Sequence, residues 1–92
     1  MKYKLKITNS FKRDYKKMIK RGVDPRLMKA VVDTLLNGDK LPEKNKDHEL
    51  RGEWLGYREC HIQPDWLMVY RIKNDILTLT LSRTGTHSDL DF

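Results

Sequence analysis

The sequence predicts an α+β domain in which a helical hairpin packs on one face of an antiparallel sheet. Two early segments, within residues 9–22 and 24–38, have the apolar spacing of amphipathic helices. Three later segments, at residues 57–62, 66–72 and 76–82, are rich in aromatic, β-branched and alternating apolar residues, as strands are. Because the turns between these strands are short, we expect an antiparallel meander and the element order β-α-α-β-β-β.

The chain length and composition predict one globular domain over residues 1–92. No apolar run approaches the roughly 20 residues of a membrane-spanning helix, so contact with a membrane is not expected. The N-terminal residues lack the apolar core of a signal peptide. The single cysteine is consistent with a reducing cytoplasm, where we expect the protein to act.

The first strand is expected at residues 2–7, where lysines alternate with Tyr3, Leu5 and Ile7. The first helix is expected to be capped by Asn9 or Ser10 and to end at Gly22. Its apolar stripe consists of Phe11, Tyr15, Met18 and Ile19.

The second helix is expected to begin at Asp24, with Pro25 at its first helical position, and to end at Gly38. Residues 37–47 are polar and predict a loop. Exposed side chains of this helix, including Met28 and Val32, are candidates for a partner surface, although a place in the core is the simpler interpretation.

The faces of the strands follow from alternation. In the strand at residues 57–62, we expect Cys60 and Ile62 to face the core and His61 to lie on the opposite, open face. In the strand at residues 76–82, the leucines are expected to pack on the helices, which leaves a solvated face lined by hydroxyl groups. These leucines are Leu77, Leu79 and Leu81.

The three histidines lie outside the predicted helices and form the main candidate site. His48 precedes the meander, His61 ends its first strand, and His87 follows the last strand after Gly85, where the chain is expected to fold back. Asp65 lies just past the first turn, within predicted reach of His61. We therefore expect the three imidazoles and Asp65 to gather at one end or face of the sheet.

Plainer roles for the histidines and aromatic residues stay open. A histidine on a strand is often a structural or surface residue, and no metal site is expected because the short paired spacings of zinc motifs are absent. Trp54, Trp66 and Tyr70 are candidates for stacking on bases, or they pack within the sheet.

The charge of the chain favours an acidic partner. Nineteen Lys and Arg residues against thirteen Asp and Glu give a net charge of +6, and the pI is about 9.6. Histidine suits RNA cleavage, because one imidazole can take the proton of the 2′-hydroxyl and another can protonate the leaving 5′-oxygen. DNA lacks this internal nucleophile, so the same groups predict action on RNA without a cofactor.

In the segments that contain the three histidines, the sequence resembles the YafQ-type toxins of the RelE/ParE superfamily. The similar segments are KDHELRGEWLGYRECHIQPDWLMVYRI and LSRTGTHSDL, with the order DH-x-L-x-G-x-W, R-x-x-H-I-x-P-D-W and R-x-G-x-H. The resemblance implies a RelE-like fold and a type II toxin that cleaves translated mRNA on the ribosome as an endoribonuclease. It also implies neutralisation by a cognate antitoxin, with DNA contacted only through the toxin–antitoxin complex.

The resemblance also implies roles for individual residues. His48, His61, Asp65 and His87 match the active-site positions of the family. His87 is expected to be the general acid, with His61 and Asp65 sharing base, orienting or phosphate-stabilising work and His48 positioning the substrate. Residues expected to bind RNA or support the transition state are Lys46, Trp66, Arg83 and Phe92.

Two positions differ from this pattern or allow another role. Arg83 shares strand parity with the core-facing leucines, so a structural salt bridge is an alternative to phosphate binding. Asp91 stands where the family has an aromatic residue, directly before Phe92. The alternative functions are a ParE-like inhibitor of DNA gyrase and a catalytically degenerate binding module.

Overall fold

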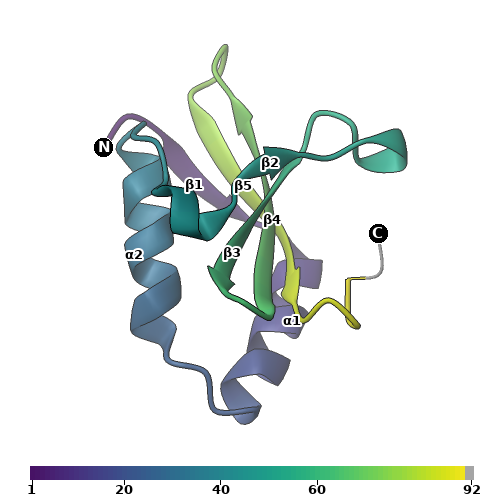
Figure 1. Cartoon of the computed structure of the whole chain (residues 1–92). Coiled ribbons are helices and arrows are strands. Elements are labelled where there is room, and N and C mark those ends of the chain that lie inside the picture. The colour runs from purple at the N-terminus through teal and green to yellow at the C-terminus, as the bar shows by residue number, and fades with distance from the viewer. Residues whose placement is uncertain (91–92) are drawn as a thin grey trace.

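The computed structural model describes residues 1–90, which form a five-stranded sheet with both long helices on one side of it (Figure 1). The helices are α1 (Asn9–Lys20) and α2 (Pro25–Leu36), with two 3-10 turns, η1 (Glu43–Asn45) and η2 (Gly52–Trp54). The strands are β1 (Lys4–Ile7), β2 (His48–Glu49), β3 (Arg58–Gln63), β4 (Trp66–Lys73) and β5 (Thr78–Gly85). The predicted α+β class and helical hairpin are confirmed.

The sheet has the strand order β1-β5-β4-β3-β2 and is mixed rather than wholly antiparallel. The predicted antiparallel meander of β3, β4 and β5 is confirmed. β1, however, pairs in parallel with β5. After β1 the helical hairpin carries the chain to the opposite edge of the sheet, so that the last strand of the meander lies beside β1. The short strand β2, which pairs His48 with Glu59, was not predicted, since two residues show no alternation.

The helix starts show which capping signals were correct. The N-cap of α1 is Thr8, rather than Asn9 or Ser10, and its hydroxyl accepts the Phe11 N–H at 3.1 Å. The same hydroxyl donates to the Ser82 carbonyl at 2.9 Å, so the tie to β5 selects Thr8. Asp24 caps α2 by accepting the Arg26 N–H at 3.0 Å, as predicted.

The main core lies between the helices and the sheet. Cys60 is fully buried there, as its strand alternation predicted. Met28 and Val32 are 6% and 8% exposed, so the interpretation that they belong to the core is confirmed. The other buried members are Tyr3, Phe11, Met18, Val31, Leu35, Leu36, Trp66, Met68, Tyr70, Leu79 and Leu81.

The second face of the sheet is not the solvated, hydroxyl-lined surface that the sequence predicted. Leu67 and Val69 of β4 are buried there together with Leu90. The segment around η2 projects from the sheet on the side away from α2 (Figure 1) and contributes partly buried apolar side chains, namely Leu50, Trp54 and Tyr57. The continuous apolar run of β4 indicated burial on both faces, because a strand exposed on one face alternates.

The last strand begins later than predicted. Leu77 lies in the preceding turn with φ 47° and is 47% exposed, so it does not join Leu79 in the core. A bulge between Val69 and Tyr70 then shifts the pairing of β4 with β5. Leu81 lies opposite Tyr70, whereas Arg83 lies opposite Val69, so the predicted shared face of Arg83 and the leucines is wrong.

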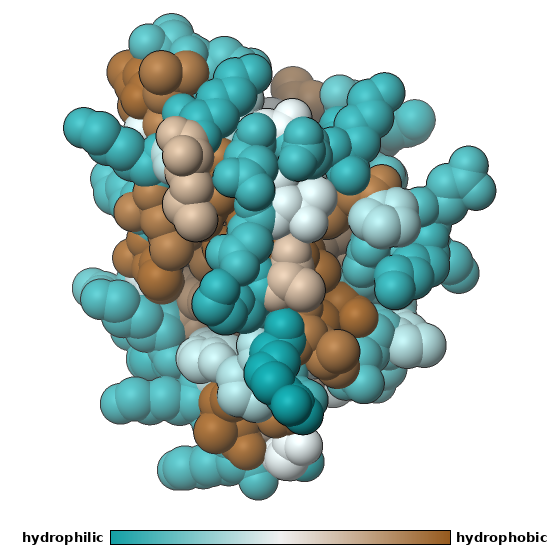
Figure 2. Space-filling view, turned by 90° about the vertical axis from the view of Figure 1, so that its left-hand side faces the viewer, coloured by the Kyte–Doolittle hydropathy of each residue, from teal (hydrophilic) through white to brown (hydrophobic). Residues whose placement is uncertain are grey.

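The surface beside the helices carries exposed apolar side chains between hydrophilic ones, and Figure 2 shows this on the side of the molecule that carries α2. A groove of about 370 Å³ runs between α1, α2 and β1. Its apolar lining consists of Leu5, Ile7, Phe11, Tyr15, Pro25, Met28, Val32, Leu36 and Leu81. Within residues 1–90, neither helix has the length and apolar character that spanning a bilayer requires.

Candidate active site

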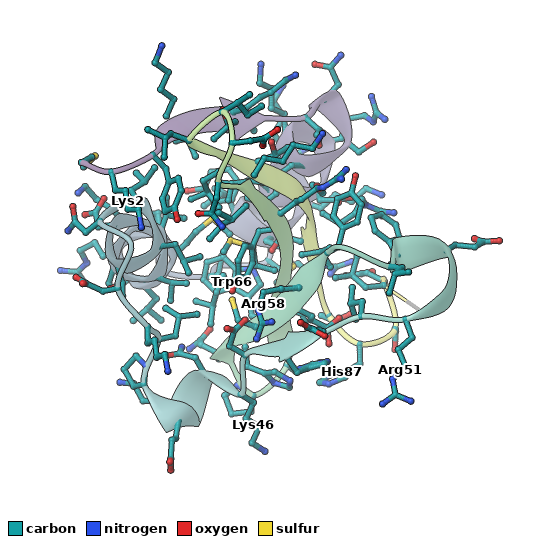
Figure 3. All side chains as sticks on the ribbon, turned by 90° about the horizontal axis from the view of Figure 1, so that it is seen from above. Lys2, Lys46, Arg51, Arg58, Trp66 and His87 are labelled. Atoms are coloured by element: carbon teal, nitrogen blue, oxygen red, sulfur yellow. The ribbon has the colours of Figure 1, made fainter. Side chains whose placement is uncertain are left out.

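The candidate site lies at the end of the sheet where the β3–β4 turn meets the C-terminal end of β5. His61 comes from β3, Asp65 from the turn, and His87 from the segment after β5. The labelled side chains of Lys46 and His87 lie on the same side of the molecule in Figure 3, remote from Lys2. The β3–β4 turn and the end of β5 thus bring His61, Asp65 and His87 together, whereas His48, which was expected to join them, does not line the same pocket.

His87 and Asp65 form a short contact at the centre of the site. Asp65 Oδ1 accepts the His87 backbone N–H at 2.9 Å and lies 2.6 Å from His87 Nδ1. These backbone and side-chain hydrogen bonds hold the pKa of Asp65 below its usual range. Because an ionised carboxylate only accepts, Nδ1 carries the proton and Nε2 is left for a second partner.

His61 lies beside this pair. Its ring centroid is 5.4 Å from that of His87, with the planes tilted by 59°. His61 Nδ1 lies 3.3 Å from the Pro64 carbonyl oxygen, which can only accept, so this contact also assigns the proton to Nδ1. Asp65, which the sequence placed within reach of His61, hydrogen-bonds to His87 instead.

His48 lies one strand further out, against a buried carboxylate. Its Nδ1 donates to the Lys46 carbonyl at 2.9 Å, and its Nε2 lies 3.5 Å from Glu59 Oε1. Glu59 is 9% exposed and was not among the candidate residues. It shares a strand face with His61 two positions away, which is the sequence signal that indicated it.

Asp47 fixes the start of β2, from which His48 projects. It accepts the Tyr70 hydroxyl at 2.5 Å and two hydrogen bonds from Arg58 Nε, at 3.2 and 3.4 Å. Burial of the hydroxyl, together with the charge of Asp47, raises the pKa of Tyr70. Tyr70 therefore stays a neutral donor and has no face available for a base, since it is 1% exposed.

A pocket of about 440 Å³ opens beside the two neighbouring imidazoles. Lys46 adopts the left-handed conformation with φ 46° where η1 ends, and its exposed side chain lines the pocket. Asn45 fixes η1 on β3 by donating to the His61 carbonyl at 2.7 Å. The lining residues are Lys44, Asn45, Lys46, His61, Ile62, Gln63, Pro64 and His87. The pocket thus combines two imidazoles with two cations.

Arg83 makes the structural salt bridge that the sequence allowed as an alternative. Its Nε donates to Asp14 Oδ2 at 2.6 Å, and its Nη2 donates to Oδ1 at 3.3 Å. The same Asp14 carboxylate accepts the Thr84 N–H at 3.2 Å, beyond the point where β1 ends its pairing with β5. Asp14 therefore closes the sheet edge next to the site, and a phosphate-binding role of Arg83 stays a prediction.

Trp66 does not have the position that RNA contact requires. Its side chain is 1% exposed and belongs to the core on the helical side, in agreement with its interior position in Figure 3. Its Nε1–H donates to Thr84 Oγ1 at 2.9 Å. Because β4 is central in the sheet and helices cover this face, the structure does not support RNA binding by Trp66, which stays a prediction. Phe92 and Asp91 lie outside the described residues.

The described residues include no group of three or more His, Cys, Asp or Glu side chains arranged to hold a metal ion. Cys60 is buried, and this burial, together with the nearby charges of Asp47 and Glu59, raises the pKa of its thiol. A thiol held in its neutral form is a poor nucleophile and a poor ligand. The pocket lining itself carries imidazole and ammonium groups, and the carboxylate of Asp65 contacts it through His87.

Comparison with known proteins identifies the family. Residues 3–91 match the model of YafQ, a bacterial toxin of type II toxin–antitoxin systems. The chain is 36% identical to the mRNA interferase toxin YafQ of Escherichia coli K12 over 87 residues, which cover 94% of this chain and 92% of the relative.

Solved structures agree with this match. A metal-bound toxin from Helicobacter pylori has a TM-score of 0.90 at 41% identity, covering 96% of this chain and 98% of the other. The E. coli DinJ–YafQ complex gives 0.88 at 35% identity, covering 96% and 97%. The chain therefore belongs to the YafQ family of bacterial toxins of type II toxin–antitoxin systems.

Proposed function

We propose that this toxin is an mRNA interferase that cleaves ribosome-engaged mRNA by acid–base catalysis at His61 and His87. The observation that supports this most directly is the pair of His61 and His87 beside Lys44 and Lys46 in one pocket, with Asp65 held against His87. A relative with 36% identity is named an mRNA interferase toxin, which supports the same activity.

The proposed reaction uses the message's own ribose as the nucleophile. His61 Nε2 takes the proton of the 2′-hydroxyl, whose oxygen then attacks the adjacent phosphorus. His87, in its imidazolium form, gives its Nε2 proton to the departing 5′-oxygen. The products are a 2′,3′-cyclic phosphate and a 5′-hydroxyl. The two rings are close enough for one phosphodiester to contact both.

The surrounding residues divide the remaining work. Asp65 orients His87 through two hydrogen bonds, so its proposed role is positioning rather than proton transfer. Lys44 and Lys46 offset the negative charge that builds on the phosphorane. His48, backed by Glu59, lies outside the pocket lining and is proposed to position the RNA strand.

The test is a purified translation system with a defined message, in which cleavage ends are mapped by primer extension and their termini are analysed chemically. We expect cuts within translated codons, with a cyclic phosphate at the end of the upstream fragment. We expect no cuts in the same message when ribosomes are absent. Cleavage of free message at the same rate would contradict the ribosome requirement. Loss of gyrase supercoiling with intact message would favour the ParE-like alternative.

The proposed partners follow from this activity and from the charge of the chain. An antitoxin with acidic and apolar side chains complements a toxin of net charge +6, and a relative forms a complex with DinJ. Contact with operator DNA is proposed only through that complex. The proposed action on translated mRNA implies that the toxin works in the cytoplasm.

Replacing Asp65 with asparagine is expected to lower the single-turnover cleavage rate by about 100-fold, within the range for acid–base groups. The amide still accepts a hydrogen bond, but it lacks the charge that stabilises the imidazolium form from which His87 gives its proton. The measurement is the rate at saturating ribosome complex. An unchanged rate would remove Asp65 from the proposed site.

The pH profile separates the carboxylate from the imidazoles. The folded-state pKa of Asp65 lies below its usual value of 3.8. The stabilising contribution of the His87 contact to Asp65 is therefore complete above pH 3.8 and is lost only as the pH falls through the lowered value. A change of rate between about pH 5 and 8 therefore does not come from protonation of Asp65. An acidic limb that disappears in Asp65→Asn alone would contradict this assignment.

A further inference from the structure

The segment after β5, residues 86–90, carries His87 and is closed by reciprocal hydrogen bonds. The Thr86 N–H donates to Asp89 Oδ2 at 2.9 Å, and the Asp89 N–H donates back to Thr86 Oγ1 at 3.2 Å. The Leu90 N–H bonds to the Thr86 carbonyl at 3.1 Å, and Leu90 is buried against Leu67 and Val69. His87 thus projects from a turn that is fixed at both ends.

A cation from the other end of the chain secures this turn. Arg21, directly after α1, donates from Nη1 to Asp89 Oδ2 at 2.5 Å and from Nη2 to Oδ1 at 3.3 Å. We call these two residues the Arg21–Asp89 clasp. The Arg21 guanidinium, followed by the Thr86 N–H, holds the pKa of Asp89 well below its usual range.

Gly85 makes the clasp possible. A Cβ at this position would lie 2.8 Å from Asp89 Cβ and 3.0 Å from Asp89 Oδ2. Gly85 does not have a positive φ, so the predicted fold-back there does not rest on backbone freedom. The absence of a side chain at Gly85 instead leaves room for the side chain of Asp89 to pack against Gly85 and accept the Thr86 N–H.

The contact between His87 and Asp65 is too exposed to fix its own geometry. The side chains of His87 and Asp65 are 58% and 66% exposed. Exposed pairs gain little from their attraction and lose side-chain entropy when they are held in one arrangement. The backbone around His87 must therefore be held by something else for the 2.6 Å contact to persist.

We infer that Arg21 and Asp89 are positioning residues, which hold the turn so that His87 stays on Asp65 with Nε2 directed to the substrate. This inference rests on the proposed function, in which His87 is the general acid. Neither residue lines the pocket. The clasp therefore acts through His87, and it contributes to the rate of the chemical step rather than to RNA affinity.

The kinetic test compares Arg21→Gln and Asp89→Asn with Arg21→Lys and a matched control. Arg26→Gln is the control, because Arg26 forms a similar exposed ion pair with the α2 cap Asp24 at 2.9 Å. Single-turnover kcat should fall about 10- to 100-fold in Arg21→Gln and Asp89→Asn, as expected for a displaced catalytic group. KM should stay unchanged, Arg21→Lys should recover most of the rate, and Arg26→Gln should match the parent.

A spectroscopic test follows His87 without any RNA. Nitrogen-15 imidazole shifts of His87, recorded against pH, report its tautomer and its contact with Asp65. Arg21→Gln and Asp89→Asn should move these shifts toward those of an unrestrained histidine, whereas Arg26→Gln and the His61 signals should not change. Unchanged His87 shifts in both clasp variants would overturn the inference.

The two tests separate this inference from the proposed function. A parent that cuts no mRNA would contradict the proposed function, and the His87 shifts would still decide whether the clasp holds the turn. A rise in KM with unchanged kcat would mean that Arg21 binds RNA directly, against the inference. Displaced His87 shifts with parental kcat would show that the clasp has no part in catalysis.

Discussion

Replacing His87 with alanine is expected to lower mRNA cleavage by about 10²- to 10⁴-fold, the usual contribution of a general acid or base. The alanine cannot protonate the 5′-oxygen, so the leaving group departs as an unstabilised alkoxide. The measurement is the single-turnover rate on ribosome-engaged message. KM should change little, because the pocket keeps His61 and both lysines.

The control for this substitution lies in the same turn. Ser88→Ala alters a neighbouring exposed residue and should retain the parental rate. Thermal unfolding of His87→Ala should stay within a few degrees of the parent, since His87 is 58% exposed. A folded His87→Ala protein that cleaves like the parent would mean that another group protonates the leaving oxygen, and the assignment of His87 would be wrong.

The local features of this fold were predictable because each depends on neighbouring residues. Asp24 before Pro25 defines the start of α2 through capping and a fixed φ, and Gly22 ends α1 by adopting φ 93°. The meander followed from short turns. The convergence of His61, Asp65 and His87 followed as well, because a hairpin turn and the end of the adjacent strand lie at the same end of the sheet.

Features that depend on pairing between remote residues were not predictable. The parallel place of β1 beside β5 depends on how the helical hairpin packs, which no local signal encodes. The bulge in the β4–β5 pairing between Val69 and Tyr70 changed the direction of Arg83, since alternation continues only through regular pairing. Arg83 forms a salt bridge with Asp14, and Arg21 forms one with Asp89, and both contacts join opposite ends of the chain.

The partner of Asp65 illustrates the same limit within the site. Proximity in sequence favoured His61, four residues earlier, as the partner of Asp65, whereas in the structure Asp65 forms its hydrogen bond with His87. The turn containing Pro64 provides the reason, because its carbonyl oxygen already lies 3.3 Å from His61 Nδ1. Alternation places Glu59 on the strand face of His61, but its burial opposite Val69 on the second apolar face depends on strand pairing and could not be read from the sequence.

Replacing Trp66 with alanine is expected to lower the free energy of unfolding by about 3–5 kcal/mol, the usual cost of deleting a buried aromatic side chain. Trp66 is 1% exposed and fills the core beneath the helices. A loss of this size removes a large part of the roughly 5–15 kcal/mol that stabilises a typical domain. Urea unfolding followed by circular dichroism measures the change.

The variant Trp66→Phe separates packing from RNA contact. It keeps a buried ring but loses the hydrogen bond to Thr84, so we expect a smaller loss of about 1–3 kcal/mol. Trp54→Phe, on the partly buried η2 segment, is the matched control and should cost less. Unchanged stability of Trp66→Phe with weakened RNA binding would show that the indole reaches RNA after all.

The expected result follows from what Trp66 connects. Its indole donates to Thr84 Oγ1, and that hydroxyl donates to the Leu67 carbonyl at 2.6 Å. These two hydrogen bonds connect the start of β4 to the end of β5. Asp65 directly precedes β4, and His87 follows β5. We therefore expect Trp66 to influence cleavage only by keeping these ends in register, and its substitution should reduce the folded population before it changes the affinity for RNA.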